Sequence, residues 1–161
     1  MHGRNLFTAV HPFLVCSLDR LLTSQRTNFC KEEPMSKIEP GLFYTQDDEW
    51  LRLEGDEALV GISDHAQDAL SDIVYLELPN VGDSFAQGEA FGVVESVKAA
   101  ADLFMPVAGE IIAVNDALVD SPEQLNSAPY ASWLVRIKLS DLEQVTSLMD
   151  ADAYLAYHEE A

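Results

Sequence analysis

Short apolar runs separated by turn residues make up the chain from Phe43 onward, a pattern typical of a β-rich domain. The apolar runs in 51–53 and 59–62 flank Gly55-Asp56, which predicts a β-hairpin. A further strand is predicted over 73–78 from its β-branched and aromatic residues. A proline and an Asn-Val-Gly-Asp turn end that strand.

Short helices and one more strand complete the prediction. Ser63-Asp64 caps a short helix. Ser121-Pro122-Glu123 opens another, because a capping hydroxyl precedes a proline at the first helical position, and this helix must end near Pro129. Residues 133–139 alternate as a half-buried strand does. The tail from Ser140 is predicted to be a C-terminal helix packed on the sheet, because its apolar residues recur at helical spacing: Leu142, Val145, Leu148 and Met149.

Residues 91–107 are apolar, then small, then apolar, with Lys98 near the middle. Gly88 lies ten residues before this lysine and Gly109 eleven after it. The near-mirror pattern predicts two strands that meet at a tight turn, with Lys98 at the tip and glycines where the chain reverses on the far side. A lysine in that place is accessible to a modifying enzyme. The alternative is that Lys98 is ordinary solvated surface.

Composition limits the classes of protein to which the chain can belong. Its 161 residues are 48% hydrophobic with a formal net charge of −19, which favours one folded domain over a disordered chain. The negative charge argues against a protein that binds nucleic-acid phosphates or a membrane surface through basic residues. No apolar run reaches the roughly 18 residues of a spanning helix, so we expect a soluble protein.

The charge changes sign along the chain. Residues 1–31 carry four basic residues against one acid, a charge of +3, whereas the part from Met35 carries five against 25, a charge of −20. The first segment has the composition of a transit peptide, or of a weak signal peptide at Leu6–Leu18. The alternative is that translation begins at Met35. We therefore expect residues 1–34 to be an N-terminal extension, disordered or outside the native fold, and residues 35–161 to be the domain.

The domain lacks the usual signatures of catalytic chemistry. Both cysteines precede Met35, so neither a disulfide framework nor a thiolate metal cluster is expected in it, and any redox chemistry must be imported. It has no Gly-rich phosphate loop, no G-x-S-x-G and no H-E-x-x-H motif. We therefore predict no catalytic residues and no metal site.

The sequence around Lys98 resembles a known family. Gly92-Val93-Val94-Glu95-Ser96-Val97-Lys98-Ala99-Ala100 is similar to the lipoyl-lysine hairpin of the H proteins of the glycine cleavage system. The resemblance extends over about residues 42 to 157, essentially the whole domain. The other matching segments, in order, are 60–67, Gly82-Asp83, 106–111, Val114-Asn115, 121–123, Asn126, Pro129-Tyr130 and Trp133-Leu134.

The resemblance implies a fold. It is a mainly β, flattened barrel-sandwich hybrid of the hammerhead type that lipoyl and biotinyl domains share, with short helices and a C-terminal helix. Biotinyl carriers have methionines on both sides of the modified lysine, where this chain has Val97 and Ala99. Lipoyl domains of acyltransferases usually have an acid before it. The H proteins therefore match best.

The resemblance also implies a function. Lipoate is attached to Lys98 in amide linkage, and the protein is a carrier, not an enzyme. It shuttles the aminomethyl group of glycine from the pyridoxal-phosphate glycine decarboxylase (P protein) to the tetrahydrofolate-dependent aminomethyltransferase (T protein). It passes electrons to dihydrolipoamide dehydrogenase (L protein). A lipoyl ligase or transferase would modify the lysine. No nucleic acid or membrane is expected as a partner.

Further site residues follow from matching positions in the family. Glu49 and Asp102 correspond to acids that hold the cationic amine near the hairpin, and His65 to a histidine that lines the same cleft. Carboxylates suit this task because a charge-assisted hydrogen bond is stronger in a partly buried cleft than in water. Glu95 is assigned to recognition by the lipoylating enzyme.

Two positions depart from the family pattern. Asp48 stands where the family usually has a histidine, which adds negative charge at the mouth of the expected cleft. Ser132 stands where it usually has a glycine, which suggests an altered loop. Neither change affects the lysine.

Two alternative functions and two compartments stay open. The chain could be a lipoyl-relay protein that donates lipoate to other complexes, or an unmodified β-barrel interaction domain. We expect a bacterial cytoplasmic protein, or a mitochondrial one if residues 1–34 are a transit peptide.

Overall fold

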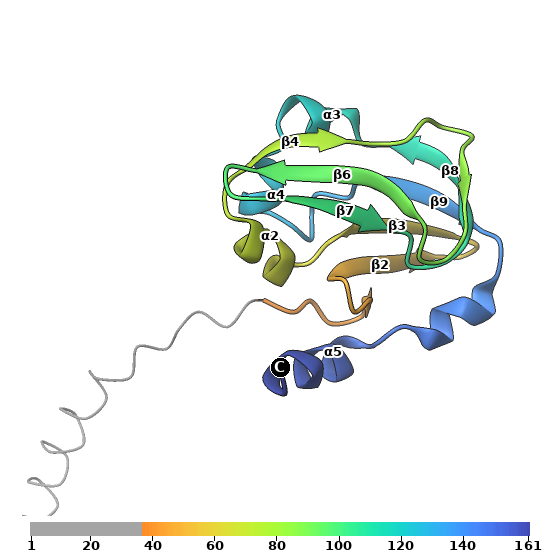
Figure 1. The fold of residues 1–161 in the computed structure, drawn as a ribbon. Helices are drawn as coiled ribbons and strands as arrows, with labels where there is room; N and C mark the ends of the chain where they lie inside the picture. The colour runs from red at the N-terminus through yellow and green to blue at the C-terminus, as the bar shows by residue number, and fades with distance from the viewer. Residues whose placement is uncertain (1–36) are drawn as a thin grey trace, which may run out of the picture. The chain divides into compact units, whose positions relative to one another are not determined.

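The computed structural model describes residues 37–161, which form two antiparallel sheets, short helices and a C-terminal helix (Figure 1). The strands are β1 (Phe43–Tyr44), β2 (Glu49–Glu54), β3 (Glu57–Ile62), β4 (Ile73–Glu77), β5 (Ser84–Phe85), β6 (Ala90–Ser96), β7 (Ala100–Phe104), β8 (Gly109–Val114) and β9 (Val135–Leu139). The helices are α2 (Asp64–Leu70), α3 (Asp116–Asp120), α4 (Gln124–Ser127), the 3-10 helix η2 (Leu142–Ser147) and α5 (Ala151–Glu159). The larger sheet has the order β1-β2-β3-β9-β8-β5, and the smaller has the order β4-β6-β7.

Local turn chemistry forms the hairpins that the sequence predicts. Glu54 pairs with Glu57, which leaves Gly55-Asp56 as a two-residue turn between β2 and β3. Gly55 has φ +75°, a left-handed conformation that glycine adopts without a Cβ penalty. The predicted cap at Ser63 is also present, since its hydroxyl accepts a hydrogen bond from the amide of Ala66 at the start of α2.

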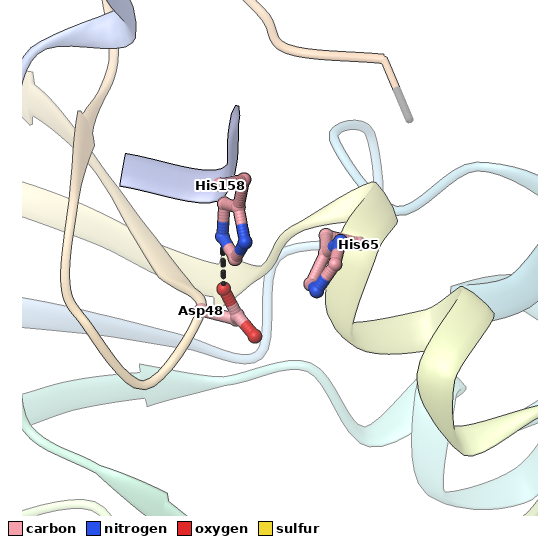
Figure 2. A group of neighbouring side chains, drawn as sticks. All are labelled: Asp48, His65 and His158. Atoms are coloured by element: carbon pink, nitrogen blue, oxygen red, sulfur yellow. Dashed lines mark hydrogen bonds and ion pairs between the residues drawn. The ribbon is translucent and has the colours of Figure 1, made fainter. Parts of the chain in front are cut away.

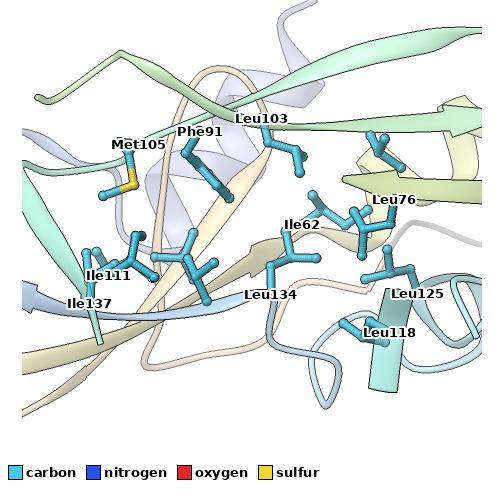
Figure 3. Close-up of a cluster of buried hydrophobic side chains, with 14 of the residues drawn as sticks. Ile62, Leu76, Phe91, Leu103, Met105, Ile111, Leu118, Leu125, Leu134 and Ile137 are labelled. Carbon is cyan, nitrogen blue, oxygen red and sulfur yellow. The ribbon is translucent and has the colours of Figure 1, made fainter. Parts of the chain in front are cut away.

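The main core lies between the two sheets. Along β9, Val135 and Ile137 are buried while Arg136 and Lys138 point away, as the period of two in a strand requires. Figure 3 shows the interdigitated side chains from both sheets, with Leu118 and Leu125 of the short helices beside them. The protein is therefore mainly β and two-layered, with short helices and a C-terminal helix, as the resemblance implies. Its two sheets do not close into a barrel.

A second, aromatic cluster holds the C-terminal helix. The Tyr154 ring of α5 stacks on Tyr44 of β1, with ring centroids 4.3 Å apart and planes within 10°. Both side chains are fully buried. Tyr130 meets Tyr44 edge-on, and Trp50 lies beside Tyr130. Helix α5 is thus anchored by aromatic packing at β1.

The C-terminal tail differs from its prediction. Instead of one helix from Ser140, the chain forms η2 and then α5. Between them, the backbone of Met149 pairs with that of Tyr44 through two hydrogen bonds of 2.7 and 2.9 Å. Asp150 then caps α5 by accepting from the amide of Ala153. The apolar spacing did not indicate this break, because pairing between backbone groups does not change the spacing of apolar side chains.

Two smaller predictions are also wrong. The short helix predicted to end near Pro129 is present as α4, but it begins at Gln124 without a side-chain cap. Ser121 instead ends α3, a five-residue helix that the pattern did not indicate. Gly109 is not in a turn: it opens β8, where an added Cβ would lie 2.7 Å from the carbonyl oxygen of Lys138. Gly88 does lie in a turn, with φ +79°.

The predictions for residues 1–34 fall outside the described residues, and the compartment stays a prediction with them. Among residues 37–161, no helix has the length and apolar character needed to cross a membrane.

Candidate functional site

Lys98 lies in the turn that joins β6 to β7. The strands pair up to Glu95 and Ala100, and the amide of Ser96 donates to the carbonyl of Ala99 over 2.7 Å. The Ser96 hydroxyl accepts from the amides of Lys98 and Ala99 at 3.2 and 3.0 Å, and it donates to the Ala99 carbonyl. One side chain thus bonds two amides and one carbonyl of this turn.

The lysine side chain itself is unconstrained. Lys98 is exposed, and within residues 37–161 it makes no side-chain hydrogen bond or ion pair that meets ordinary distance limits. Its neighbour Val97 is 69% exposed, while the Val97 amide donates to the Asp72 carbonyl over 3.0 Å. The backbone of the tip is therefore fixed while the Nζ atom projects into solvent.

Strands β4 and β6 approach each other closely beside the hairpin. At Gly92 of β6, an added Cβ would lie 2.4 Å from the carbonyl oxygen of Glu77 in β4. Any side chain there would separate the two strands. The glycine is thus required for β6 to run as the central strand between β4 and β7.

Glu49 is the one acidic side chain among residues 37–161 that is almost fully buried, with 1% exposed. Its Oε1 accepts from the amide of Phe104 over 3.0 Å, and its Oε2 accepts from the Thr45 hydroxyl. Burial raises the pKa of Glu49 to about 7, against the effect of these two hydrogen bonds. The carboxyl group therefore changes charge near neutral pH.

Glu49 also lines a pocket of about 220 Å³ beside the end of β7. Phe104 and Met105 also line this pocket, as do Ser147 and Met149 of the C-terminal tail. A small cationic group that entered here would meet the buried Glu49 carboxyl group, to which a charge-assisted hydrogen bond is stronger than a neutral one.

The other predicted site residues lie elsewhere. Asp102 is exposed on β7, opposite Val93, and Glu95 is exposed near the hairpin tip. His65, on α2, does not line the Glu49 pocket; its ring lies 3.9 Å, centroid to centroid, from that of His158 on α5. Neither His65 nor Asp102 lines the pocket that contains Glu49.

The departure at Asp48 is explained by residues that sequence reasoning missed. Asp48 accepts hydrogen bonds from Tyr154 at 2.6 Å and from His158 at 2.9 Å, so its charge is engaged and not free at a cleft mouth. Thr45 and Phe104, which hold Glu49, were also missed. The contact with Phe104 spans 55 positions, and no local sequence signal could have indicated it.

Comparison with known proteins supports the family resemblance that the sequence around Lys98 indicates. The family model described as glycine cleavage H-protein matches residues 42–161. The chain belongs to this family. The glycine cleavage system H protein of Burkholderia ambifaria is 56% identical over 121 residues, which are 74% of this chain and 96% of the relative. That of Halothermothrix orenii is 49% identical over 124 residues, 76% of this chain and 97% of the relative.

A solved H-protein structure shares the fold. The crystal structure of a glycine cleavage system H protein from Mycobacterium marinum matches with a TM-score of 0.70 and 35% identity, over 77% of this chain and all of that one. Since the H-protein match runs from residue 42 to the C-terminus, it includes the hairpin, Glu49 and helix α5.

Proposed function

We propose that this protein is a lipoyl carrier of the glycine cleavage system, with Lys98 as the attachment site. It would serve the P, T and L proteins in turn, and would itself be modified by a lipoyl ligase or transferase. Membership of the H-protein family supports this proposal. The observation that carries it is the position of Lys98, at the exposed tip of a backbone-fixed turn between small residues.

The residues at the tip fit an amide-linked lipoyl group. Lys98 has no partner within the described residues that must first be displaced, and Ala99 and Ala100 offer no bulk against a modifying enzyme. When attached, the group supplies the redox-active disulfide that the domain, without cysteine, does not have. The chain then acts as a carrier and breaks no bond with its own side chains.

The protein residues have positioning tasks in this proposal. Ser96 holds the backbone of the turn, so that Lys98 has a fixed place at the tip while its side chain is free to move. Glu49 would accept a hydrogen bond from a cationic amine in its pocket. For Asp102 and His65 we retain the cleft role as part of the proposal, and for Glu95 recognition by the lipoylating enzyme.

Mass spectrometry of the full chain from a lipoylation-competent host tests the attachment site. We expect one lipoyl adduct on the peptide that contains Lys98. Lys98→Arg should lose it, and Lys138→Arg, which changes another exposed lysine, should keep it. An unmodified Lys98 in the presence of active ligase and lipoate would refute the carrier function and favour an unmodified interaction domain.

Reconstitution tests the system that the carrier serves. The lipoylated chain, mixed with P protein, pyridoxal phosphate and glycine, should release carbon dioxide, and the Lys98→Arg chain should not. A lipoylated chain that supports no decarboxylation of glycine would instead indicate a lipoyl-relay role.

A further inference from the structure

Three metal-ligating side chains converge where helix α5 ends, outside the Glu49 pocket. Asp48 comes from the turn before β2, His65 from the first turn of α2 and His158 from the last turn of α5 (Figure 2). One ligand atom from each lies within 4.8 Å of the others, and all three residues are half-buried. The set therefore joins segments that are up to 110 positions apart.

The spacing of two of the three ligand atoms suits an ion. His158 Nε2 and Asp48 Oδ1 are 2.9 Å apart. For an ion about 2.1 Å from each atom, the angle between the two metal–ligand bonds would be roughly 90°, as in five- and six-coordinate sites. The metal would replace the proton that His158 now donates to Asp48.

The third ligand is free to join them. Within residues 37–161 the His65 ring makes no hydrogen bond, although it lies against the His158 ring with planes inclined by 35°. A ring nitrogen of His65 already lies within 4.8 Å of the other two ligand atoms, and binding an ion would break no hydrogen bond of this ring within the described residues.

The surroundings already orient the carboxylate. The Tyr154 hydroxyl donates to Asp48 over 2.6 Å and lies 2.8 Å from the Ser63 hydroxyl. Since Tyr154 uses its proton on Asp48, Ser63 donates to Tyr154. A hydrogen-bonded chain behind a ligating carboxylate is the usual support of a metal site. Tyr154 and Tyr157 also flank the His158 ring edge-on.

We propose that Asp48, His65 and His158 form a binding site for a divalent transition metal ion such as Zn²⁺, which ties the end of α5 to α2 and to the turn before β2. Two imidazoles and one carboxylate are a ligand set that such ions favour over Mg²⁺ or Ca²⁺. Water completes the coordination, since the residues are only half-buried. The formal charge of −19 on the chain favours any cation.

Metal titration of the full chain, stripped with EDTA, tests this site. Zn²⁺ affinity is measured by competition with a chromophoric chelator, and Co²⁺ is used as a spectroscopic substitute. We expect one ion per folded domain, and Co²⁺ bands in the visible region without thiolate charge transfer. His65→Ala should weaken Zn²⁺ binding by more than about tenfold. The fold should survive, because the ring makes no hydrogen bond in the described part of the chain.

Two control variants separate this site from other sources of binding. Glu159→Gln removes an exposed acid next to His158 and should bind Zn²⁺ as the unmodified chain does. A chain in which His2, His11, Cys16 and Cys30 are all replaced should also keep the site.

Three outcomes would overturn the proposal. The first is that His65→Ala and His158→Ala both bind Zn²⁺ as tightly as the chain without a substitution. The second is that Zn²⁺ binding is lost only when the residues before Met35 are changed. The third is that the chain without a substitution does not bind Zn²⁺.

Discussion

The hairpin tip and the C-terminal anchor are built in opposite ways. The tip around Lys98 is exposed, with small side chains and a turn held by backbone groups and one serine hydroxyl. The anchor around Tyr154 is buried, with stacked rings and a polar chain drawn from three segments. The difference indicates that stability and presentation are separated: the lysine carries little of the fold, and the aromatic anchor carries none of the attachment chemistry.

Removal of the anchor should have the largest effect on stability. Tyr154→Ala loses a fully buried ring that stacks on Tyr44, together with two hydrogen bonds. We expect a loss of about 3–5 kcal/mol in the free energy of unfolding, measured with denaturant. Tyr157→Ala, which removes a 40% exposed tyrosine from the same helix, should cost far less.

The same variant tests the separation directly. Under conditions where Tyr154→Ala is still folded, its Lys98 should be lipoylated as fast as Lys98 of the chain without the substitution. A parallel loss of lipoylation would show that the anchor and the hairpin form one cooperative unit.

Glu49 lies between the two regions and should make stability depend on pH. Its pKa is about 7 in the folded protein against an ordinary value of 4.5 in an unfolded chain, so the folded state holds the proton more tightly. The contribution of this proton to the free energy of unfolding is fully present below pH 4.5 and is lost as the pH rises through 7. The difference is on the order of 3 kcal/mol.

Denaturation with EDTA present, at several pH values, checks this prediction. The free energy of unfolding of Glu49→Gln relative to the unmodified chain should rise between pH 4.5 and 8, because the variant has no charge to desolvate. Glu95→Gln, an exposed acid, is the matched control and should follow the unmodified chain. Parallel curves for Glu49→Gln and the unmodified chain would contradict the raised pKa.

The turn hydroxyl should have a smaller and local effect. Ser96→Ala leaves the amides of Lys98 and Ala99 without their acceptor, but both are exposed to water. We expect a loss of about 1 kcal/mol, with faster hydrogen exchange at these two amides and slower lipoylation. Ser96→Thr, which keeps the hydroxyl, should restore the hydrogen-exchange rates and the rate of lipoylation. Unchanged exchange in Ser96→Ala would show that the strands alone fix the tip.

The contrast between the regions also explains which features the sequence predicted. The hairpins at Gly55-Asp56 and Lys98 depend on neighbours within a few positions, and both were found from apolar patterning and turn residues. The cap at Ser63 is equally local. Local patterns indicate such elements, because their hydrogen bonds close over short loops.

The site and the tail depend on contacts that local patterns do not encode. The buried Glu49 accepts from the amide of Phe104, 55 positions away, and Asp48 is bonded to His158, 110 positions away. The break at Met149 follows from pairing with Tyr44. Resemblance to the H proteins directed attention to Glu49 and His65, but only the three-dimensional packing separates them into a pocket and a histidine pair.

Salt should have the smallest effect, and it should act on encounters with partner enzymes rather than on the fold. From Met35 onward the chain carries a charge of −20, which would steer it toward basic surfaces. In reconstituted glycine decarboxylation, the KM for fully lipoylated carrier should rise several-fold from low to high salt while kcat changes little. Glu95→Gln, near the tip, should reduce this dependence more than Glu110→Gln on β8, because Glu95 lies near the lysine that the partner enzymes have to approach. A KM that does not change with salt would exclude steering by charge.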